Sequence, residues 1–489
     1  MIYPIVLGGC MDYLEVLDGM KEDMLHTLQD AIKIDSVLAP AVKGEDGQTY
    51  PFGAGIQKAY EHMLSVGEEM GFETANYDNY GGHIEFKAPD SEKVETFGIT
   101  THLDVVPVGE GWETDPFDPI VKDGWIYGRG TSDDKGPAVA ALYAMKAIKE
   151  AGITPKKNIR MILGLDEETD KEGMIYYRDH VEKMPELGIT PDADFPVVQG
   201  EMGILVFDIA RKLSGGKAGD GLKFRSMESG VAYNIVSPQA KVVVFSEDQK
   251  DYDDIASKAE AFSGKTGYKV TTKKQGKSLV IESFGVQAHG ARPQEGLNAI
   301  SIMMAFLGEL DFADSGVNEF TEYYNKYIGF DLEGGKMGPV IHDEPSGNLI
   351  FNVGLASGDE DVISVTVNIR YPVTYTDEQV YEVFEKTLEG TEVGFVKKML
   401  EKPVYLPDDD PMVQNLIGAY VDETGDDKTK PLVMGGGTYA KLIPGTLAYG
   451  GMFPGDEDRM HQANERLLLD HFYKSARIYA RAIYKICCQ

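Results

Sequence analysis

Five short segments of the sequence carry histidine and carboxylate side chains, the groups that bind divalent metal ions in proteins. By itself, each segment has an ordinary explanation, such as a surface His–Asp pair, an acidic helix N-terminus or a solvated run of charge. Together they supply two imidazoles and several carboxylates, a combination that favours metal chemistry. The segments are His102-Leu103-Asp104, Gly128–Gly136, Asp166-Glu167-Glu168, Pro191–Asp194 and Asp458–Gln462.

Two of these segments have an informative spacing. Residues i and i+2 of an extended strand share a face, so Asp104 can accept a hydrogen bond from the His102 ring and fix its tautomer. Asp166, Glu167 and Glu168 come directly after a predicted buried strand. Two carboxylates about 4 Å apart repel each other by roughly 4 kcal/mol at an effective dielectric near 20. Either cations or open solvent must relieve that repulsion.

The combined donor set suits two borderline divalent ions such as Zn²⁺, with one carboxylate bridging them. Asp104 and Glu167 bring the carboxylates to five, and two divalent ions would offset most of that negative charge. Glu167 is then free to act as general base on a metal-bound water. The predicted ligands are His102, Asp133, Glu168, Asp192 and His461.

The elements that must position these residues predict an α/β domain. Strands are expected over 82–88, 97–106 and 158–165. Strand, helix and strand in that order indicate a parallel sheet with right-handed crossovers. Open sheets of this kind build their sites at the carboxyl ends of strands, where most of the polar segments fall. The accompanying helices are expected over 13–33, 56–71 and 136–151.

After about residue 203 the sequence becomes rich in alternating, β-type runs. Helices are expected at 298–310 and from Thr376, where TDEQ is a capping-box pattern. This order predicts an α+β domain with an antiparallel sheet. A pattern typical of helices returns at about residue 406, and a long helix is expected over 463–487. We therefore predict an α/β domain of residues 1–202 and 406–489, with an inserted α+β domain of residues 203–405.

The composition narrows the choice of partners. The chain has 489 residues, with 47 basic and 80 acidic side chains and a formal net charge of −33. This charge argues against nucleic acid and against an anionic membrane surface as partners, because both need clustered Lys and Arg. Three cysteines, Cys10, Cys487 and Cys488, make no disulfide framework and favour a reducing, cytoplasmic setting.

The start of the chain and its apolar runs bear on whether the sequence carries an export signal or a transmembrane segment. The opening Met1–Cys10 is apolar and ends in LGGC, but it has no basic n-region and its apolar run is short. We interpret it as the packed start of the first domain, in preference to a lipoprotein cleavage site. No stretch of the sequence approaches a transmembrane span. A P-loop is excluded because neither GK[ST] triplet of the sequence follows the glycine pattern of a nucleotide site.

The motifs resemble those of the co-catalytic metallopeptidases, a family that includes carboxypeptidase G, acetylornithine deacetylase, succinyl-diaminopimelate desuccinylase and the aminoacylases. Within it, the PepV-type dipeptidases are the most similar. The resemblance implies a zinc-peptidase-like α/β catalytic domain with a mixed, mostly parallel sheet, and an inserted, enlarged ferredoxin-like α+β lid. The matching motifs span nearly the whole chain: THLDVVPVGEGWETDPFDP, YGRGTSDDKGP, GLDEET, PDADFPVVQGEMG, GVQAHGARPQEGLNA, NIRYP, MGGGTYAKLIPG and FPGDEDRMHQANE.

The resemblance implies roles for the residues of the metal site. His102 matches the first metal histidine and Asp104 the aspartate that orients it. Asp133 matches the bridging ligand, which is often followed by a cis peptide bond, and Glu167 matches the catalytic base. The remaining ligands match Glu168, Asp192 and His461, with Asp194 left open as an alternative to Asp192. Asp166 departs from the family pattern, and it could compete with Glu167 for the water.

Further matches concern the substrate. His289 resembles the histidine that closes over the scissile carbonyl, and Asn234 resembles an asparagine that helps to hold the oxyanion. Arg370 resembles the arginine that binds the substrate carboxylate. The loop of Gly435–Tyr439 could present backbone N–H groups to the same carboxylate, from Gly436, Gly437 and Thr438. The lid segment 211–230 has no detailed assignment.

The resemblance implies metal-dependent hydrolysis of dipeptides with a free C-terminal carboxylate, through a metal-bridging water activated by Glu167. The two divalent ions would be Zn²⁺, with Mn²⁺ or Co²⁺ as alternatives. An N-acyl amino acid deacylase or a carboxypeptidase remains an alternative with the same chemistry, and a non-catalytic binding protein is a further one. The length of the lid favours a monomer whose His289 acts in its own chain.

Overall fold

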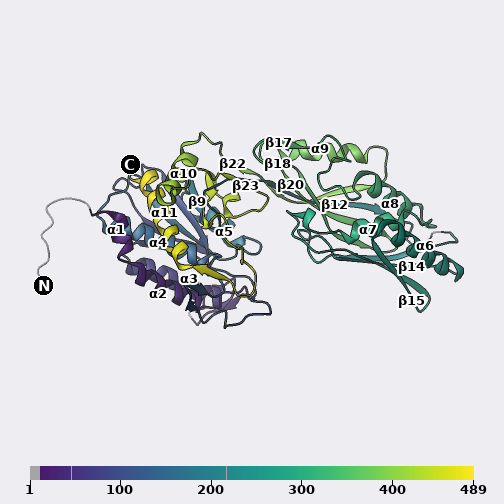
Figure 1. The fold of residues 1–489 in the computed structure, drawn as a ribbon, viewed down its shortest axis with the longest axis horizontal. Coiled ribbons are helices and arrows are strands. Elements are labelled where there is room, and N and C mark those ends of the chain that lie inside the picture. Colours follow the sequence, from purple (N-terminus) through teal and green to yellow (C-terminus); the bar gives the residue numbers. More distant parts are fainter. Residues whose placement is uncertain (1–10, 46, 216, 218) are drawn as a thin grey trace, which may run out of the picture. The chain divides into compact units, whose positions relative to one another are not determined.

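The computed structural model describes residues 11–45, 47–215, 217 and 219–489. These residues form two compact units. The first contains the described residues up to Gly200, with Val404–Val433 and Gly437–Gln489, and the second contains Glu201–Pro403 with Met434–Gly436. In Figure 1 the first unit combines the purple and blue start of the chain with its yellow end, and the second is teal and green. The interpretation of Met1–Cys10 falls outside the described residues.

The described part of the first unit has a nine-stranded mixed sheet, ordered β22-β11-β24-β9-β5-β8-β4-β3, with β23 paired to β11. The four central strands from β24 to β8 are parallel. The pairs β8–β4, β4–β3 and β11–β24 are antiparallel. The strands are β3 (Glu73–Tyr77), β4 (Gly81–Phe86), β5 (Thr96–His102), β8 (Asn158–Gly164), β9 (Leu187–Thr190), β11 (Val198–Glu201), β22 (Val404–Tyr405), β23 (Leu432–Met434) and β24 (Thr446–Ala448).

Helices cover both faces of this sheet. The helices are α1 (Tyr13–Asp18), α2 (Lys21–Ile32), α3 (Ala54–Glu69), α4 (Lys135–Glu150), α5 (Glu172–His180), α10 (Pro411–Thr424) and α11 (Leu469–Cys487).

Strand alternation decides which helices meet which face of the sheet. Ile84, Ile99 and Met161 face one side, in one core with residues of α3, α4 and α11. Ile162 faces the other side, in a smaller core with Met174 of α5. Helix α4 is almost wholly buried and packs along α11, as Figure 1 shows. Its small alanine side chains permit that close approach.

Short strand pairs complete the first unit. The pair β10–β25 lies next to the candidate site, and β26 is antiparallel to β7. These elements are β1 (Val42–Lys43), β2 (Thr49–Tyr50), β6 (Ile120–Lys122), β7 (Trp125–Tyr127), β10 (Ala193–Asp194), β25 (Gly451–Met452), β26 (Arg466–Leu468) and the 3-10 turn at Tyr439–Lys441.

The described part of the second unit is built on an eight-stranded antiparallel sheet, ordered β15-β16-β14-β13-β19-β20-β12-β21. Alternate residues of β12 and β20, such as Phe207 and Val367, enter a core shared with four helices. The strands are β12 (Gly203–Lys212), β13 (Lys223–Ser229), β14 (Gln239–Phe245), β15 (Lys269–Gln275), β16 (Ser278–Phe284), β17 (His342–Asp343), β18 (Gly347–Asn348), β19 (Ile350–Gly358), β20 (Val362–Tyr371) and β21 (Gly394–Glu401). The helices are α6 (Lys250–Thr266), α7 (Ala299–Leu307), α8 (Ser315–Tyr327) and α9 (Asp377–Leu388), with a 3-10 turn at Pro293–Glu295.

The predicted fold class is confirmed, with a mixed α/β sheet in one unit and an antiparallel α+β sheet in the other. Thr376 caps α9 with the predicted capping box. Two predicted helices differ from the structure. The first is interrupted between Asp18 and Lys21, and the last begins at Leu469, because Arg466–Leu468 pair with β7 as a strand.

Among the described residues, no helix is long and apolar enough to cross a membrane.

Gly136 provides a test of the packing that positions the loop before α4. A Cβ at Gly136 would lie 2.0 Å from the Thr131 carbonyl oxygen, a distance that forces the loop to shift. We expect Gly136→Ala to lower the free energy of unfolding by about 1–3 kcal/mol, as overpacking does. Urea denaturation would measure the change.

Gly418→Ala is the matched control in the same unit. This position lies inside α10, where a Cβ would make only ordinary contact with Lys485 at 3.9 Å. Because alanine is the better helix former, the control should leave stability unchanged or raise it by up to about 1 kcal/mol. Equal losses in both variants would contradict the packing argument.

Candidate metal centre

Three neighbouring parallel strands end together at the candidate site. His102 is the last residue of β5 and pairs with Gly164, the last residue of β8. Glu167 and Glu168 follow β8, and Asp192 follows β9. Because parallel strands present their carboxyl ends at one edge of the sheet, these side chains converge there.

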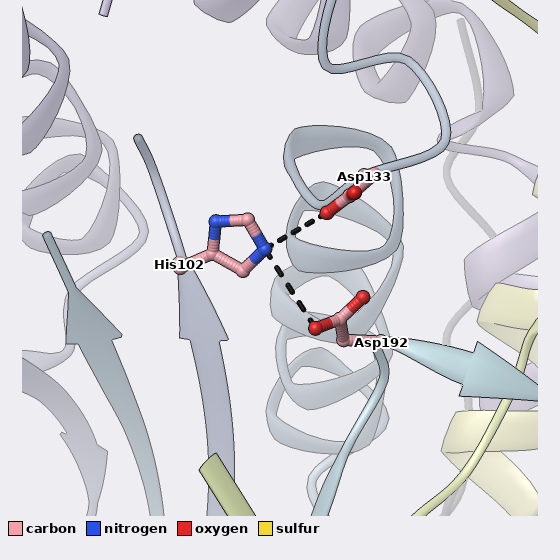
Figure 2. Close-up of side chains that lie close together, drawn as sticks. All are labelled: His102, Asp133 and Asp192. Atoms are coloured by element: carbon pink, nitrogen blue, oxygen red, sulfur yellow. Dashed lines mark hydrogen bonds and ion pairs between the residues drawn. The ribbon is translucent and has the colours of Figure 1, made fainter. Parts of the chain in front are cut away.

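Asp133 stands between two groups of possible ligand atoms. Its Oδ1 lies 2.9 Å from His102 Nε2, and its Oδ2 lies 2.9 Å from His461 Nε2. Asp192 Oδ2 lies 3.8 Å from His102 Nε2, and Figure 2 shows both carboxylates facing that nitrogen. Glu168 Oε1 lies 2.9 Å from His461 Nε2. In each group the ligand atoms lie within 4.8 Å of one another, which is close enough for one ion.

The two histidines have different surroundings. His102 is buried at the end of β5, with 1% of its side chain exposed, whereas the His461 side chain is 54% exposed. His461 lies in the loop between β25 and β26 with a positive φ of 60°. Asp133 precedes α4, and the Asp133–Asp134 peptide bond is cis, as the resemblance implies. Asp133 therefore contacts both the buried His102 and the more exposed His461.

Asp104 joins the histidine strand to the acidic segment. Its Oδ1 lies 3.3 Å from His102 Nδ1, which also lies 3.0 Å from the Asp104 carbonyl oxygen. The backbone N–H groups of Glu167 and Glu168 donate to Oδ1 and Oδ2 of Asp104 at 3.2 and 3.1 Å. A proton on His102 Nδ1 would be held by Asp104, which leaves Nε2 as the electron-pair donor.

Burial and mutual contact shift the pKa values of the cluster. Burial raises the pKa of Glu168 to about 7 and that of Asp192 to about 7. Hydrogen bonds to Asp133 and Glu168 raise the pKa of His461 to about 11. Burial acts against the ionised form of Asp133, but contacts with His102 and His461 outweigh it and lower its pKa. The carboxylates therefore need positive charge, which either protons or metal ions can supply.

Glu167 lies beside this cluster and pairs with a lysine. Lys171 Nζ lies 2.8 Å from Glu167 Oε1 and 3.3 Å from the Gly437 carbonyl oxygen. Burial raises the pKa of Glu167 to about 8, and Lys171 opposes that rise. A carboxylate with a pKa near neutrality can take up and release a proton in the working range of most enzymes.

Three other acids of these segments have different surroundings. Asp166 accepts from Gly173 N at 2.9 Å at the start of α5, so its carboxylate is directed at that helix, and it pairs with neither histidine. Asp134 Oδ2 accepts from the backbone N–H of His102 at 3.1 Å. Asp194 is exposed in β10, and it is Asp192 that lies within reach of His102.

The predicted substrate residues of the second unit come together separately. Gly290 N donates to the Asn234 carbonyl oxygen at 2.7 Å, so the loop carrying Asn234 runs beside the loop carrying His289. A Cβ at Gly435 would lie 3.3 Å from the Cβ of Ala291 and 3.8 Å from Arg370 Cγ. Arg370 is 5% exposed, on β20.

Beside Arg370 lies a row of buried polar atoms on one face of the second sheet. Asn352 and Asn368 are cross-strand partners, and Arg370 follows two residues later on the same face. Glu401 is across from Ile204, the residue opposite Arg370. Within the described ranges, five atoms of four residues in this row have no hydrogen-bond partner: Asn352 Oδ1, the amide N and O of Asn368, Arg370 Nε and Glu401 Oε2. Such atoms are costly unless something else satisfies them.

Sequence reasoning missed two residues of the first unit. Lys171 lies four residues after Glu167, but a lysine in an acidic run has no distinctive signal. Glu465 is fully buried and accepts hydrogen bonds from the loop that carries Asp133. Its position in HQANE, close after His461, was the available signal. In the predicted Gly435–Tyr439 loop, Thr438 accepts from Ala440 N at 3.1 Å.

Comparison with known proteins agrees with this arrangement. The profile of "Peptidase family M20/M25/M40" matches residues 98–485. A Bacillus subtilis (strain 168) protein named "Putative dipeptidase YtjP" is 34% identical over 467 residues, 95% of this chain and 97% of that protein. A Staphylococcus saprophyticus protein with a corresponding name is 34% identical over 477 residues, 96% of this chain and 99% of that protein.

A solved structure shares the fold at low sequence identity. The dipeptidase Dug1p from Saccharomyces cerevisiae matches with a TM-score of 0.54 and 13% identity, covering 97% of each chain. At that identity the likeness concerns the fold alone. The bacterial relatives match most of the sequence, and the profile match spans every segment of the candidate metal centre. The chain therefore belongs to peptidase family M20/M25/M40 and is a metallopeptidase.

Proposed function

We propose that this chain hydrolyses dipeptides with a free C-terminal carboxylate, as a monomer, with two divalent cations and with Glu167 as general base. The observation that carries the proposal is the position of Asp133, whose two carboxylate oxygens each lie 2.9 Å from a different histidine. A carboxylate with a histidine near each of its oxygens would suit a ligand that is shared by two ions.

The donor set fits two such ions. His102, Asp133 and Asp192 would hold one, and Asp133, Glu168 and His461 the other. Imidazole and carboxylate donors suit Zn²⁺, and they also suit Mn²⁺ or Co²⁺. When bound, the cations would polarise the scissile carbonyl and make water a stronger acid.

The surroundings of Glu167 support the proposed role as general base. It is next to the proposed ligand Glu168, and its backbone is fixed by the Asp104 carboxylate. The ion pair with Lys171 favours the ionised form that accepts a proton from the attacking water. Glu167 would then pass that proton to the leaving amine, which completes hydrolysis of the peptide bond.

For the second unit, the family resemblance supplies the roles. Arg370 would bind the C-terminal carboxylate of the substrate, together with backbone N–H groups of Gly436, Gly437 and Thr438. His289 and Asn234 would donate hydrogen bonds to the oxyanion that forms from the scissile carbonyl. The proximity of Gly435 to Arg370 supports a shared role in binding the carboxylate.

Glu167→Gln tests the general base. The variant keeps the shape of the side chain but cannot accept the proton, so kcat should fall by about 10²–10⁴-fold. Metal content should stay that of the wild type, measured by elemental analysis of the same sample. The exposed Glu172→Gln, five residues away on α5, is the control and should keep full activity. Near-normal turnover by Glu167→Gln would remove Glu167 from the chemistry.

Arg370→Ala tests the substrate class. A charge-assisted hydrogen bond is worth about 1.5–3 kcal/mol, so KM for free-acid dipeptides should rise by about 10–100-fold. KM for dipeptide amides should change little, because the amides lack the carboxylate. Lys398→Ala removes a half-exposed cation from β21, which pairs with β12 and not with the Arg370 strand, and should leave KM unchanged.

The same assay on the wild-type enzyme separates the alternatives. Dipeptides should be hydrolysed faster than tripeptides and N-acyl amino acids. A preference for N-acyl amino acids would favour a deacylase, and an equal effect of Arg370→Ala on acids and amides would refute the carboxylate role.

Metal affinity should depend on pH. Glu168 and Asp192 each have a pKa raised to about 7 by burial, so protons compete with the ions below that pH. For each such ligand, affinity should be roughly tenfold weaker at pH 6 than at pH 8. Titration of chelator-treated enzyme with Zn²⁺ at both pH values would measure it, with return of activity on metal addition as the parallel readout. Full activity after complete metal removal, or an affinity independent of pH, would contradict the proposed site.

A further inference from the structure

Glu465 is a buried carboxylate that no step of the proposed chemistry uses. It is 0% exposed and lies on the same segment as His461, four residues further along. Burying an ionised carboxylate is unfavourable unless it is both paired and hydrogen-bonded. Its partners therefore indicate why it is there. Most of them belong to residues 128–133, here called the Asp133 loop.

The Glu465 carboxylate collects backbone donors from the Asp133 loop. Oε1 accepts from Ser132 N at 2.9 Å and from Asp133 N at 3.3 Å. Gly130 N lies 3.1 Å from each carboxylate oxygen. The Glu465 carbonyl oxygen accepts from Gly128 N at 3.1 Å. Four N–H groups of a short irregular loop thus end on one residue, so the path of that loop depends on Glu465.

A buried arginine compensates the charge of Glu465 and extends the contact to a third segment. Arg129 is 1% exposed, and its Nη1 donates to Glu465 Oε2 at 2.7 Å. Its Nη2 donates to the carbonyl oxygens of Pro107 and Val108 at 3.3 and 3.4 Å. Those residues lie three and four positions after Asp104, on the segment that continues from β5 and His102. The ring of Trp112 lies 5.3 Å from the guanidinium.

We propose that Glu465 is a positioning residue, which holds Asp133 in register with His102 and His461 and so sets the affinity of the metal centre. The inference rests on the proposed metal site. Each of the three segments that meet at Asp133 is connected to Glu465: the Asp133 loop by hydrogen bonds, the His461 segment by the chain itself, and the His102 segment through Arg129. Loss of a residue that orients metal ligands typically weakens metal binding by about 10–100-fold.

The carboxylate cannot be replaced by an amide of the same shape. In Glu465→Gln, one acceptor oxygen becomes an NH₂ group, which must face either Arg129 Nη1 or the backbone N–H groups of the loop. All of these are donors, so at least one buried donor loses its partner. Glu465→Asp keeps the charge and both acceptors but is one methylene shorter, and it should have an intermediate effect.

The experiment is a titration of chelator-treated full-length protein with Co²⁺, followed by visible absorption, on four proteins. These are the wild type, Glu465→Gln, Glu465→Asp and the control Glu457→Gln. Glu457 is exposed and belongs to the same C-terminal segment, where it pairs with Arg459 and Arg466 at the surface. We expect Glu465→Gln to bind Co²⁺ about 10–100-fold more weakly and with a changed spectrum, and Glu457→Gln to stay within twofold of the wild type.

The outcomes separate this inference from the metal site itself. If the wild type fails to bind Co²⁺, the proposed metal centre is wrong. If the wild type binds and Glu465→Gln matches it in affinity and spectrum, while only its urea midpoint falls, Glu465 has a purely structural role and the inference is overturned. If Glu465→Gln does not fold, Glu465→Asp carries the same test. If neither variant folds, Glu465 serves folding, and the inference is overturned as well.

Discussion

The bridging position of Asp133 is the interaction on which the rest of this site depends. Carboxylates that are brought together in a protein interior repel each other and lose their hydration, so they stay together only when positive charge is supplied. Here the two histidines each contact a different oxygen of Asp133, and His461 also contacts Glu168. The chain has a net charge of −33, and this small group is the part of it that the proposed function uses.

Two buried carboxylates have parallel structural roles around this centre. Asp104 accepts from the backbone N–H groups of Glu167 and Glu168, and Glu465 accepts from those of Ser132 and Asp133. In both cases a side chain from one segment fixes the backbone of another segment that carries functional groups. Irregular loops lack the regular backbone hydrogen bonds of a strand pair. Side-chain carboxylates therefore accept hydrogen bonds from the N–H groups of these loops.

Much of this arrangement was predictable from sequence, for identifiable reasons. Strand ends in an α/β sheet gather polar residues, and the fold class and the strands that lead to His102 and Glu167 followed from hydrophobic runs. Spacing could not reveal that Asp166 is directed at α5 or that Lys171 reaches Glu167, because both depend on how a turn folds. The helix expected from 463 begins only at Leu469, since pairing with β7 outweighs local helical preference. The role of Glu465 depends on contacts with a loop more than 300 residues earlier in the chain, which no local pattern records.

Among the described residues, some buried polar atoms of Asn352, Asn368, Arg370 and Glu401 lack a hydrogen-bond partner, which has a consequence for engineering. Replacing a buried, unsatisfied amide by an apolar side chain of similar size removes a desolvation penalty, so such changes are expected among stabilised variants. A library of this protein that is screened only for heat resistance would therefore enrich leucine at positions such as 368. Because Arg370 of that row is proposed to bind the substrate, directed evolution would have to select for turnover in every round to retain it.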